Sequence, residues 1–253
     1  MVLVCWISCW ASDGSARTPG QIMSLPNEAP RTPILCYVSD RHFLSHIDTE
    51  ASREALLNKI QAAASAGVDW IQIREKDLSA RDCALITRHA LRRIAKSSAG
   101  SASSSRLAVN DRLDVAVSEH SGGVHLGEHG LPVAEVKGLV SSRADCKNFL
   151  IGASCHSLEA ARSAEHDGAN YIFFGPVFAT PSKAAYGAPQ GLERLAEICA
   201  AISIPVLAIG GITLENAARC LQSGAAGLAA IRLFQETEDL VSLALKLKGS
   251  GHY

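Results

Sequence analysis

Charged side chains in this 253-residue chain follow short apolar runs, and several of them suit the binding of a phosphorylated molecule. One run reads Gln-Ile-Arg-Glu-Lys, and the alternation of an extended strand places Gln72, Arg74 and Lys76 on one side. Arginine and lysine so placed suit a phosphate or diphosphate. The pattern fits equally well a salt-bridge cluster with Glu75 and Asp77, so both interpretations stay open.

A second run ends in Asn110 and Asp111, a neutral amide followed by a carboxylate. A carboxylate oxygen is a hard ligand that suits Mg2+, which commonly keeps several waters and bridges phosphate oxygens. The competing interpretation makes Asp111 the N-cap of a helix that starts at Leu113, which is a common role for aspartate.

Two histidines follow later apolar runs. His125 and His156 are each placed to transfer a proton near neutral pH, although a lone histidine is more often a structural hydrogen-bonding group. Ser154 ends the run before His156, and Ser157 fits the N-cap of the following helix.

The last part of the chain carries hydroxyl groups and glycines suited to an anion. Thr180, Ser182 and Lys183 lie in a loop shaped by glycine and proline, which fits either an anion cradle or an ordinary polar loop. Gly211 follows another glycine and permits close approach of a phosphate to the backbone. Ile231 and Arg232 stand at the end of the final apolar run.

These residues need elements that bring their ends together, and the chain alternates short apolar runs with helical patterns. Short runs bounded by Gly, Asp or Asn are typical of parallel strands covered on both faces. We expect strands at 34–39, 69–74, 106–110, 123–126, 149–154, 170–175, 205–210 and 227–232. We expect helices at 50–66, 79–96, 113–118, 132–140, 157–166, 192–201, 214–223 and 238–248.

Eight strands in strict alternation with eight helices predict an α/β fold, and specifically a (β/α)8 TIM barrel. Its functional groups would then gather where the strands end. We expect one barrel domain over residues 31–250. Residues 1–30 differ in composition, and we expect an N-terminal extension that is disordered or lies upstream of a true start at Met23.

The net charge and the cysteines limit the kinds of partner and the cellular compartment that we expect. The formal net charge is −1, which gives no general attraction to nucleic acid or to an anionic membrane. Eight cysteines are present without a CxxC pair, so we expect reduced thiols in a cytoplasmic protein. The expected partners are small phosphorylated molecules, with a homo-oligomer left open.

The order and spacing of these runs resemble the thiamine phosphate synthases and their relatives, the TenI-like thiazole tautomerases, over roughly residues 34–247. The resemblance is carried by QIREK (72–76), ND (110–111), HLG (125–127), GASCHS (152–157), GPVFATPSK (175–183) and AIGGI (208–212).

The resemblance implies a transferase of thiamine biosynthesis that couples hydroxymethylpyrimidine diphosphate to thiazole phosphate and releases pyrophosphate. It implies Mg2+ held by Asp111, with Arg74 and Lys183 as catalytic residues. The substrate-binding set that it implies is Gln72, Arg74, Lys76, Asn110, Ser154, Thr180, Ser182, Lys183, Gly211, Ile231 and Arg232.

This chain departs from the family pattern at three places. Gly130 stands where the synthases usually carry an aspartate that serves as the second Mg2+ ligand, and Glu128 or His129 would have to compensate. Ser182 replaces a threonine but keeps the hydroxyl group. Arg232 replaces a small polar residue, which would either strengthen phosphate binding or change the substrate.

Two other functions remain open. The tautomerase moves a double bond in a thiazole carboxylate phosphate without a metal, and His156 would then be its catalytic acid and base. A non-catalytic barrel that binds a phosphorylated ligand is the lesser alternative. The loss of the second aspartate favours the tautomerase, whereas the retention of Lys76, Asn110 and Asp111 favours the synthase.

Overall fold

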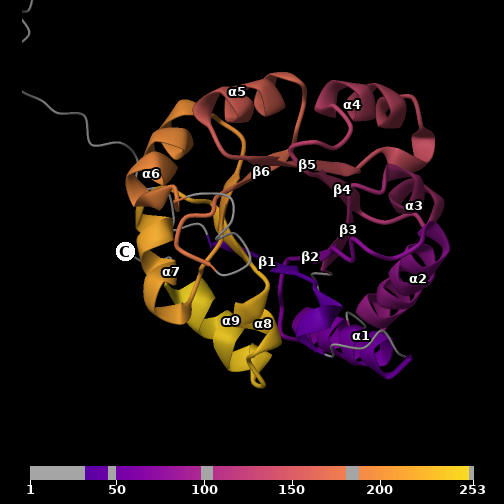
Figure 1. Ribbon diagram of the computed structural model, residues 1–253. Helices are drawn as coiled ribbons and strands as arrows, with labels where there is room; N and C mark the ends of the chain where they lie inside the picture. The colour runs from indigo at the N-terminus through magenta and orange to yellow at the C-terminus, as the bar shows by residue number, and fades with distance from the viewer. Residues whose placement is uncertain (1–31, 45–49, 98–104, 181–187, 251–253) are drawn as a thin grey trace, which may run out of the picture.

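The chain folds as a closed barrel of eight parallel strands surrounded by helices, as the computed structural model shows (Figure 1). The structure describes residues 32–44, 50–97, 105–180 and 188–250. The strands pair in sequence order, and β1 closes the ring against β8. They are β1 (Ile34–Val38), β2 (Trp70–Ile73), β3 (Arg106–Asn110), β4 (Gly123–Leu126), β5 (Leu150–Cys155), β6 (Tyr171–Phe174), β7 (Val206–Ile209) and β8 (Gly227–Ala230).

The helices cover the outside of this ring. Those that follow the first four strands are α1 (Glu50–Ser65), α2 (Ala80–Ser97), α3 (Leu113–Ser118) and α4 (Val133–Ser141). Those that follow the others are α5 (Leu158–His166), α6 (Gly191–Ala201), α7 (Leu214–Gln222), α8 (Arg232–Gln235) and α9 (Leu240–Gly249). Two 3-10 turns, η1 (Arg41–Phe43) and η2 (Ala144–Cys146), complete the described elements.

The predicted TIM barrel is confirmed, and the predicted strands and helices agree with the observed ones to within two residues at their ends. The last strand was expected to reach Arg232. The strand stops at Ala230, because a short helix that the sequence did not reveal begins at Arg232. The predicted extension 1–30 lies outside the described residues.

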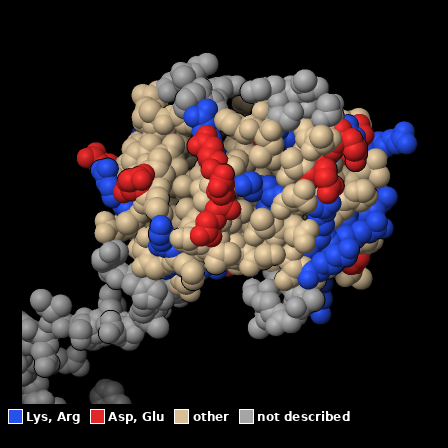
Figure 2. Space-filling view, turned by 90° about the horizontal axis from the view of Figure 1, so that it is seen from below, with Lys and Arg blue, Asp and Glu red and all other residues tan. Residues whose placement is uncertain are grey.

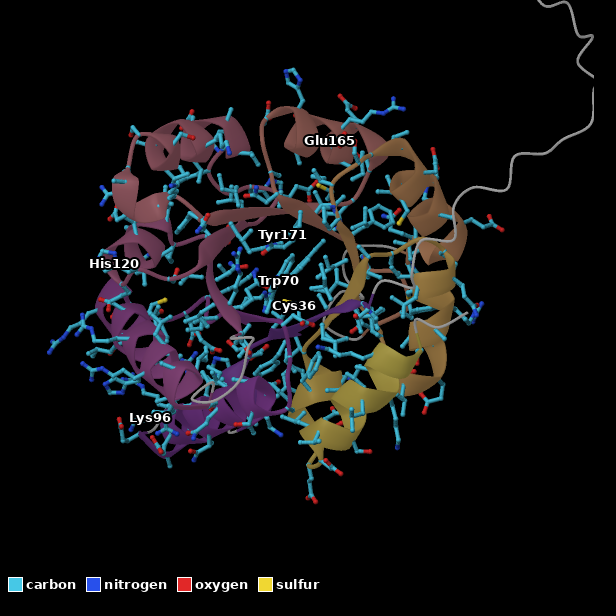
Figure 3. All side chains as sticks on the ribbon, turned by 180° about the vertical axis from the view of Figure 1, so that it is seen from behind. Cys36, Trp70, Lys96, His120, Glu165 and Tyr171 are labelled. Atoms are coloured by element: carbon cyan, nitrogen blue, oxygen red, sulfur yellow. The ribbon has the colours of Figure 1, made fainter. Side chains whose placement is uncertain are left out.

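Two apolar layers hold the barrel together. The outer layer lies between strands and helices and includes Leu56, Ile71 and Val124. The inner layer fills the barrel itself with large side chains, so the ring has a packed centre. Figure 3 shows Cys36, Trp70 and Tyr171 in this centre, whereas Lys96, His120 and Glu165 lie at the periphery. The rings of Trp70 and Tyr171 lie 4.5 Å apart, centroid to centroid.

Glycines end several helices. Gly67, Gly168 and Gly224 each have a positive φ, between 78° and 97°, in the turn between a helix and the next strand. A left-handed residue at this position lets the chain leave the helix and re-enter the sheet within a few residues, which keeps all strands parallel and their ends at one rim.

The described surface mixes both signs of charge. Figure 2 shows acidic and basic side chains side by side on one face of the molecule, in keeping with the net charge of −1. Within the described residues, no helix combines the length and the apolarity needed to cross a membrane.

Candidate active site

A row of hydrogen-bonded polar side chains runs along the rim where β2, β3 and β4 end. The amide of Gln72, which is only 2% exposed, donates to Asn110 Oδ1 over 3.0 Å. Asn110 in turn donates through Nδ2 to Asp111 Oδ2 over 2.7 Å. The row ends where the backbone N–H of Gly127 donates to Asp111 Oδ1 over 2.6 Å. The sequence-predicted residues at the ends of β2 and β3 therefore form one connected unit, which the backbone after β4 extends.

Asp111 does not cap the following helix, so that competing interpretation is wrong. The N-cap of α3 is Arg112, which makes no side-chain capping bond, and the Asp111 carboxylate instead contacts the loop after β4. Asp111 adopts a φ of 57°, a left-handed conformation that is uncommon for residues other than glycine. Such strain at a polar residue is commonly found at functional sites.

Gly130 lies against the same carboxylate. A Cβ atom added to Gly130 would stand 2.8 Å from Asp111 Oδ1, so a side chain here would be in direct contact with Asp111. An aspartate at this position would place a second carboxylate beside the first. Gly130 supplies no such group, and the nearby Glu128 faces His156, with 3.6 Å between Oε2 and Nε2.

A buried histidine links the next two strands. His125, at the end of β4, is 1% exposed and contacts Ser154 Oγ over 2.9 Å and Tyr171 Oη over 3.2 Å. Its ring lies 4.1 Å from that of Phe173, centroid to centroid. Burial, and secondarily the positive charge of Arg74, lower the pKa of His125 to about 3. The imidazole is therefore neutral at physiological pH and acts as a hydrogen-bonding partner of Ser154 rather than as a proton shuttle.

Gly152 makes room for this histidine. A Cβ atom at Gly152 would come within 2.6 Å of His125 Nδ1 and even closer to the ring of Tyr171. The glycine of the GASCHS run is therefore required by the packing of His125 and Tyr171. Tyr171 was not among the predicted site residues, because from sequence it is only one apolar residue of a buried strand.

The side chains after β2 divide between two environments. Glu75 is buried and accepts hydrogen bonds from Ser39 and Arg41, and Asp77 is held by the guanidinium of Arg41. The salt-bridge cluster predicted for Glu75 and Asp77 thus exists, but Arg41 supplies the cation. Within the described residues no salt bridge involves Arg74, whose charge acts on the neighbouring His125.

The loops after β6 and β7 lie against each other. The backbone N–H of Phe178 donates to the Gly210 carbonyl over 3.0 Å, and a Cβ atom at Gly211 would stand 2.6 Å from the Ala179 carbonyl oxygen. Gly211, with a φ of 66°, therefore lies next to the segment that carries the half-buried Thr180. The predicted site residues Ser182 and Lys183 lie outside the described residues.

Other predicted residues lie on the same rim. His156 Nδ1 donates to the Gly175 carbonyl, and Ser157 caps α5 by accepting from the Ala160 N–H over 3.1 Å, as one interpretation had it. Ile231 follows β8 directly. Arg232 is exposed and places its guanidinium carbon 4.9 Å from the centroid of the Phe43 ring, a cation–π contact. Lys76 is also exposed.

The fold and this rim define a class: a (β/α)8 barrel enzyme with a connected row of polar side chains at the ends of its strands. A family model described as thiamine monophosphate synthase matches residues 44–234. The chain belongs to that family. Two of its relatives are the thiamine-phosphate synthases of Methanoculleus marisnigri and Methanocella arvoryzae, 43% and 41% identical over 186 residues. Each match covers 74% of this chain and, respectively, 83% and 82% of the relative.

A solved structure agrees with this assignment. The thiamine phosphate pyrophosphorylase from Pyrococcus furiosus is 30% identical, with a TM-score of 0.70. The match covers 87% of this chain and 96% of that one. The similarity thus extends over the whole barrel.

Proposed function

We propose that this chain is a thiamine phosphate synthase. It joins hydroxymethylpyrimidine diphosphate to thiazole phosphate: the bond from the methylene carbon to the diphosphate breaks, and the thiazole nitrogen forms a new bond to that carbon. Family membership supports the proposal, and so do the names of the relatives. The main structural support is the connected row Gln72–Asn110–Asp111 at one end of the barrel, together with the charge of Arg74, which acts on the nearby His125.

The chemistry places specific demands on these residues. A diphosphate leaving group needs positive charge, which Arg74, Lys76 and Lys183 would supply. The departing diphosphate leaves a cation that the pyrimidine ring stabilises, so the enzyme acts mainly by orienting both partners. Gln72, Asn110 and Ser154 would hold the diphosphate and pyrimidine. Thr180, Ser182 and Gly211, with Ile231 and Arg232 nearby, would hold the thiazole phosphate.

We propose further that Asp111 holds Mg2+ together with the substrate diphosphate. Each oxygen of Asp111 accepts one hydrogen bond and retains a lone pair for a metal ion. Mg2+ commonly binds through one or two carboxylates together with substrate phosphates, so a single carboxylate suffices. When bound, the ion would neutralise charge on the departing diphosphate.

The test is a coupling assay with both substrates, using the wild type and Asp111→Ala. We expect turnover by the wild type and a loss of at least about tenfold in the variant, which corresponds to ~1.4 kcal/mol in the barrier. Glu128→Ala serves as the matched control, because its carboxylate faces His156 rather than Asp111. Turnover that is the same in Asp111→Ala would exclude the metal assignment, and a wild type without turnover would exclude the synthase.

Tautomerase activity is the second candidate, and two observations favour it. Gly130 lies against Asp111 and offers it no carboxylate, and His156 stands at the rim with one nitrogen on the Gly175 carbonyl and the other near Glu128. The same preparation should therefore be given thiazole carboxylate phosphate without metal. Conversion that is lost in His156→Ala would assign this activity.

We place the enzyme in the cytoplasm. Six cysteines fall among the described residues, all of them as free thiols and five of them buried. Burial raises the pKa of Cys155 and of Cys220 to about 12, so these thiols stay protonated. Unpaired, unreactive thiols suit a reducing compartment.

A further inference from the structure

The acidic side chains that follow β2 join a hydrogen-bonded network around a buried arginine, and the proposed reaction does not use this network. This network consists of Ser39, Arg41, Glu75 and Asp77, and we call it the Arg41 cluster. Arg41 is 1% exposed although it is fully charged. A charge is costly to bury unless it is paired and hydrogen-bonded, so the position of Arg41 has to be compensated by its contacts.

Ser39 extends the sheet by one hydrogen bond beyond the last paired residues. The β1–β2 ladder ends at Val38 and Gln72, and the N–H of Ser39 donates to the Gln72 carbonyl over 2.9 Å. The Ser39 hydroxyl then accepts the backbone N–H of Arg74 over 3.0 Å. The same hydroxyl donates to Glu75 Oε1 over 2.5 Å, so its orientation is fixed by the carboxylate.

Arg41 holds the other side of the segment. Its backbone N–H and its Nη1 each donate to Glu75 Oε2 over 3.1 Å. Its guanidinium also binds Asp77 in a two-pronged contact, with Nη1–Oδ1 at 2.7 Å and Nη2–Oδ2 at 2.5 Å. Residues 74, 75 and 77 are thus each attached to the segment after β1, which leaves little freedom for the backbone between them.

The charges of the cluster have a second effect. Burial raises the pKa of Glu75, while hydrogen bonds from Ser39 and Arg41 oppose that shift; the hydrogen bonds from Arg41 lower the pKa of Asp77. Removing one partner of a buried ion pair leaves an uncompensated charge. Without Arg41, the carboxylate of Glu75 would attract the nearby cations Arg74 and Lys76, which the diphosphate needs.

We propose that Ser39 and Arg41 are positioning residues for anion binding: they fix the backbone at 74–77 so that Arg74 and Lys76 are aimed at the diphosphate. The proposal rests on the proposed function for the identity of the anion. Neither residue is among the site residues that the sequence predicts. Ser39 and Arg41 would act through Arg74 without touching the substrate.

The test measures binding of pyrophosphate, in the presence of Mg2+, by titration calorimetry on the full chain. Ser39→Ala removes the hydroxyl and leaves the barrel otherwise intact, so we expect affinity about tenfold weaker, equivalent to ~1.4 kcal/mol. Arg41→Met should weaken binding at least as much, and Arg41→Lys should not restore it, because lysine cannot form the two-pronged contact with Asp77.

A double-mutant cycle separates positioning from a general loss of stability. If Ser39 acts mainly through Arg74, then Ser39→Ala should cost much less affinity in an Arg74→Met background, where only the contribution of Lys76 remains. Ser121→Ala is the matched control. It also removes a buried serine hydroxyl, which donates to the Gly123 carbonyl over 3.1 Å at the start of β4, and it should bind pyrophosphate like the wild type.

Three results would overturn the proposal. They are an affinity of Ser39→Ala within twofold of the wild type, an equal loss in the Arg74→Met background, or a wild type that does not bind pyrophosphate. If Arg41→Met fails to fold, Ser39→Ala and its double-mutant cycle with Arg74→Met still test the proposal. A wild type that binds pyrophosphate but performs no coupling would contradict the proposed function alone.

Discussion

The surroundings of His125 keep its imidazole from taking up a proton near neutral pH. It lies between two hydroxyl groups and two aromatic rings, and burial is the largest cause of its lowered pKa. From sequence it was one of two histidines suited to proton transfer, because spacing does not reveal burial. The structure divides the two: His125 supports Ser154 inside the barrel, and the half-buried His156 lies at the rim.

This environment predicts a pH dependence of stability. An unfolded histidine takes up a proton below about pH 6.5, whereas folded His125 does so only near pH 3. Between these values the unfolded state binds more protons, so His125 makes the free energy of unfolding fall as the pH falls through this window. We expect His125→Gln to reduce that slope by up to about 1.4 kcal/mol per pH unit.

The measurement is urea unfolding between pH 3 and pH 7 for both proteins. His120→Gln is the control, because His120 lies exposed at the periphery and its replacement should leave the slope as in the wild type (Figure 3). Parallel curves for wild type and His125→Gln would contradict the assignment of a neutral buried imidazole.

Among the elements, the loops after β6 and β7 depend on one glycine. Gly211 combines a positive φ with a close approach to the Ala179 carbonyl. Gly67 has a positive φ of 78° too, but a Cβ atom there would meet nothing within 4 Å. The two glycines therefore separate the cost of the backbone conformation from the cost of pushing the Thr180 loop away.

We expect Gly67→Ala to lower the free energy of unfolding by about 1–2 kcal/mol, because alanine is strained at positive φ. Gly211→Ala should lower it further, because its Cβ would also meet the Ala179 carbonyl oxygen. Only Gly211→Ala should also raise KM for thiazole phosphate, by at least about tenfold, since its Cβ displaces the loop. Denaturant unfolding and steady-state kinetics measure the two effects. Equal KM values for both variants would show that this loop does not hold the phosphate.

The helices and strands were predictable because each follows from a pattern of neighbouring residues in the sequence. Apolar runs bounded by glycine, asparagine or aspartate gave the strands, and glycines at helix ends gave the turns. Helix α8 was missed because four residues are too few for a helical period to show. The partners of Glu75 were missed for another reason: Arg41 is 34 residues away in the chain, and only closure of β1 against β2 brings the two together.

On the scale of the whole molecule, one end of the barrel contributes to stability and the other carries the candidate active site. At the end where the strands begin, Asp69 accepts the Leu35 N–H through Oδ2 over 2.9 Å and contacts the ammonium group of Lys248 through Oδ1 over 3.1 Å. Lys248 also donates to the Gly67 carbonyl over 2.8 Å. One carboxylate thus connects β1, β2 and the last helix, far along the strands from the polar rim.

We expect Asp69→Ala to lower the free energy of unfolding by about 1–3 kcal/mol, because it leaves the Leu35 N–H without its acceptor. The kcat/KM of the folded enzyme should stay within twofold of the wild type. Thermal unfolding and the coupling assay measure the two quantities, with Asp239→Ala, an N-cap on α9, as a comparison. A large loss of activity in Asp69→Ala would contradict this separation of the two ends.

The different roles of neighbouring residues after β2 affect how mutational data for such enzymes are interpreted. A growth-based selection would score Glu75 with the ligand-binding residues, since losing it should abolish growth as surely as losing Arg74. Yet the carboxylate faces Ser39 and Arg41. Intolerance to change along this run therefore mixes direct recognition with the framework behind it, and the two alternate from one residue to the next.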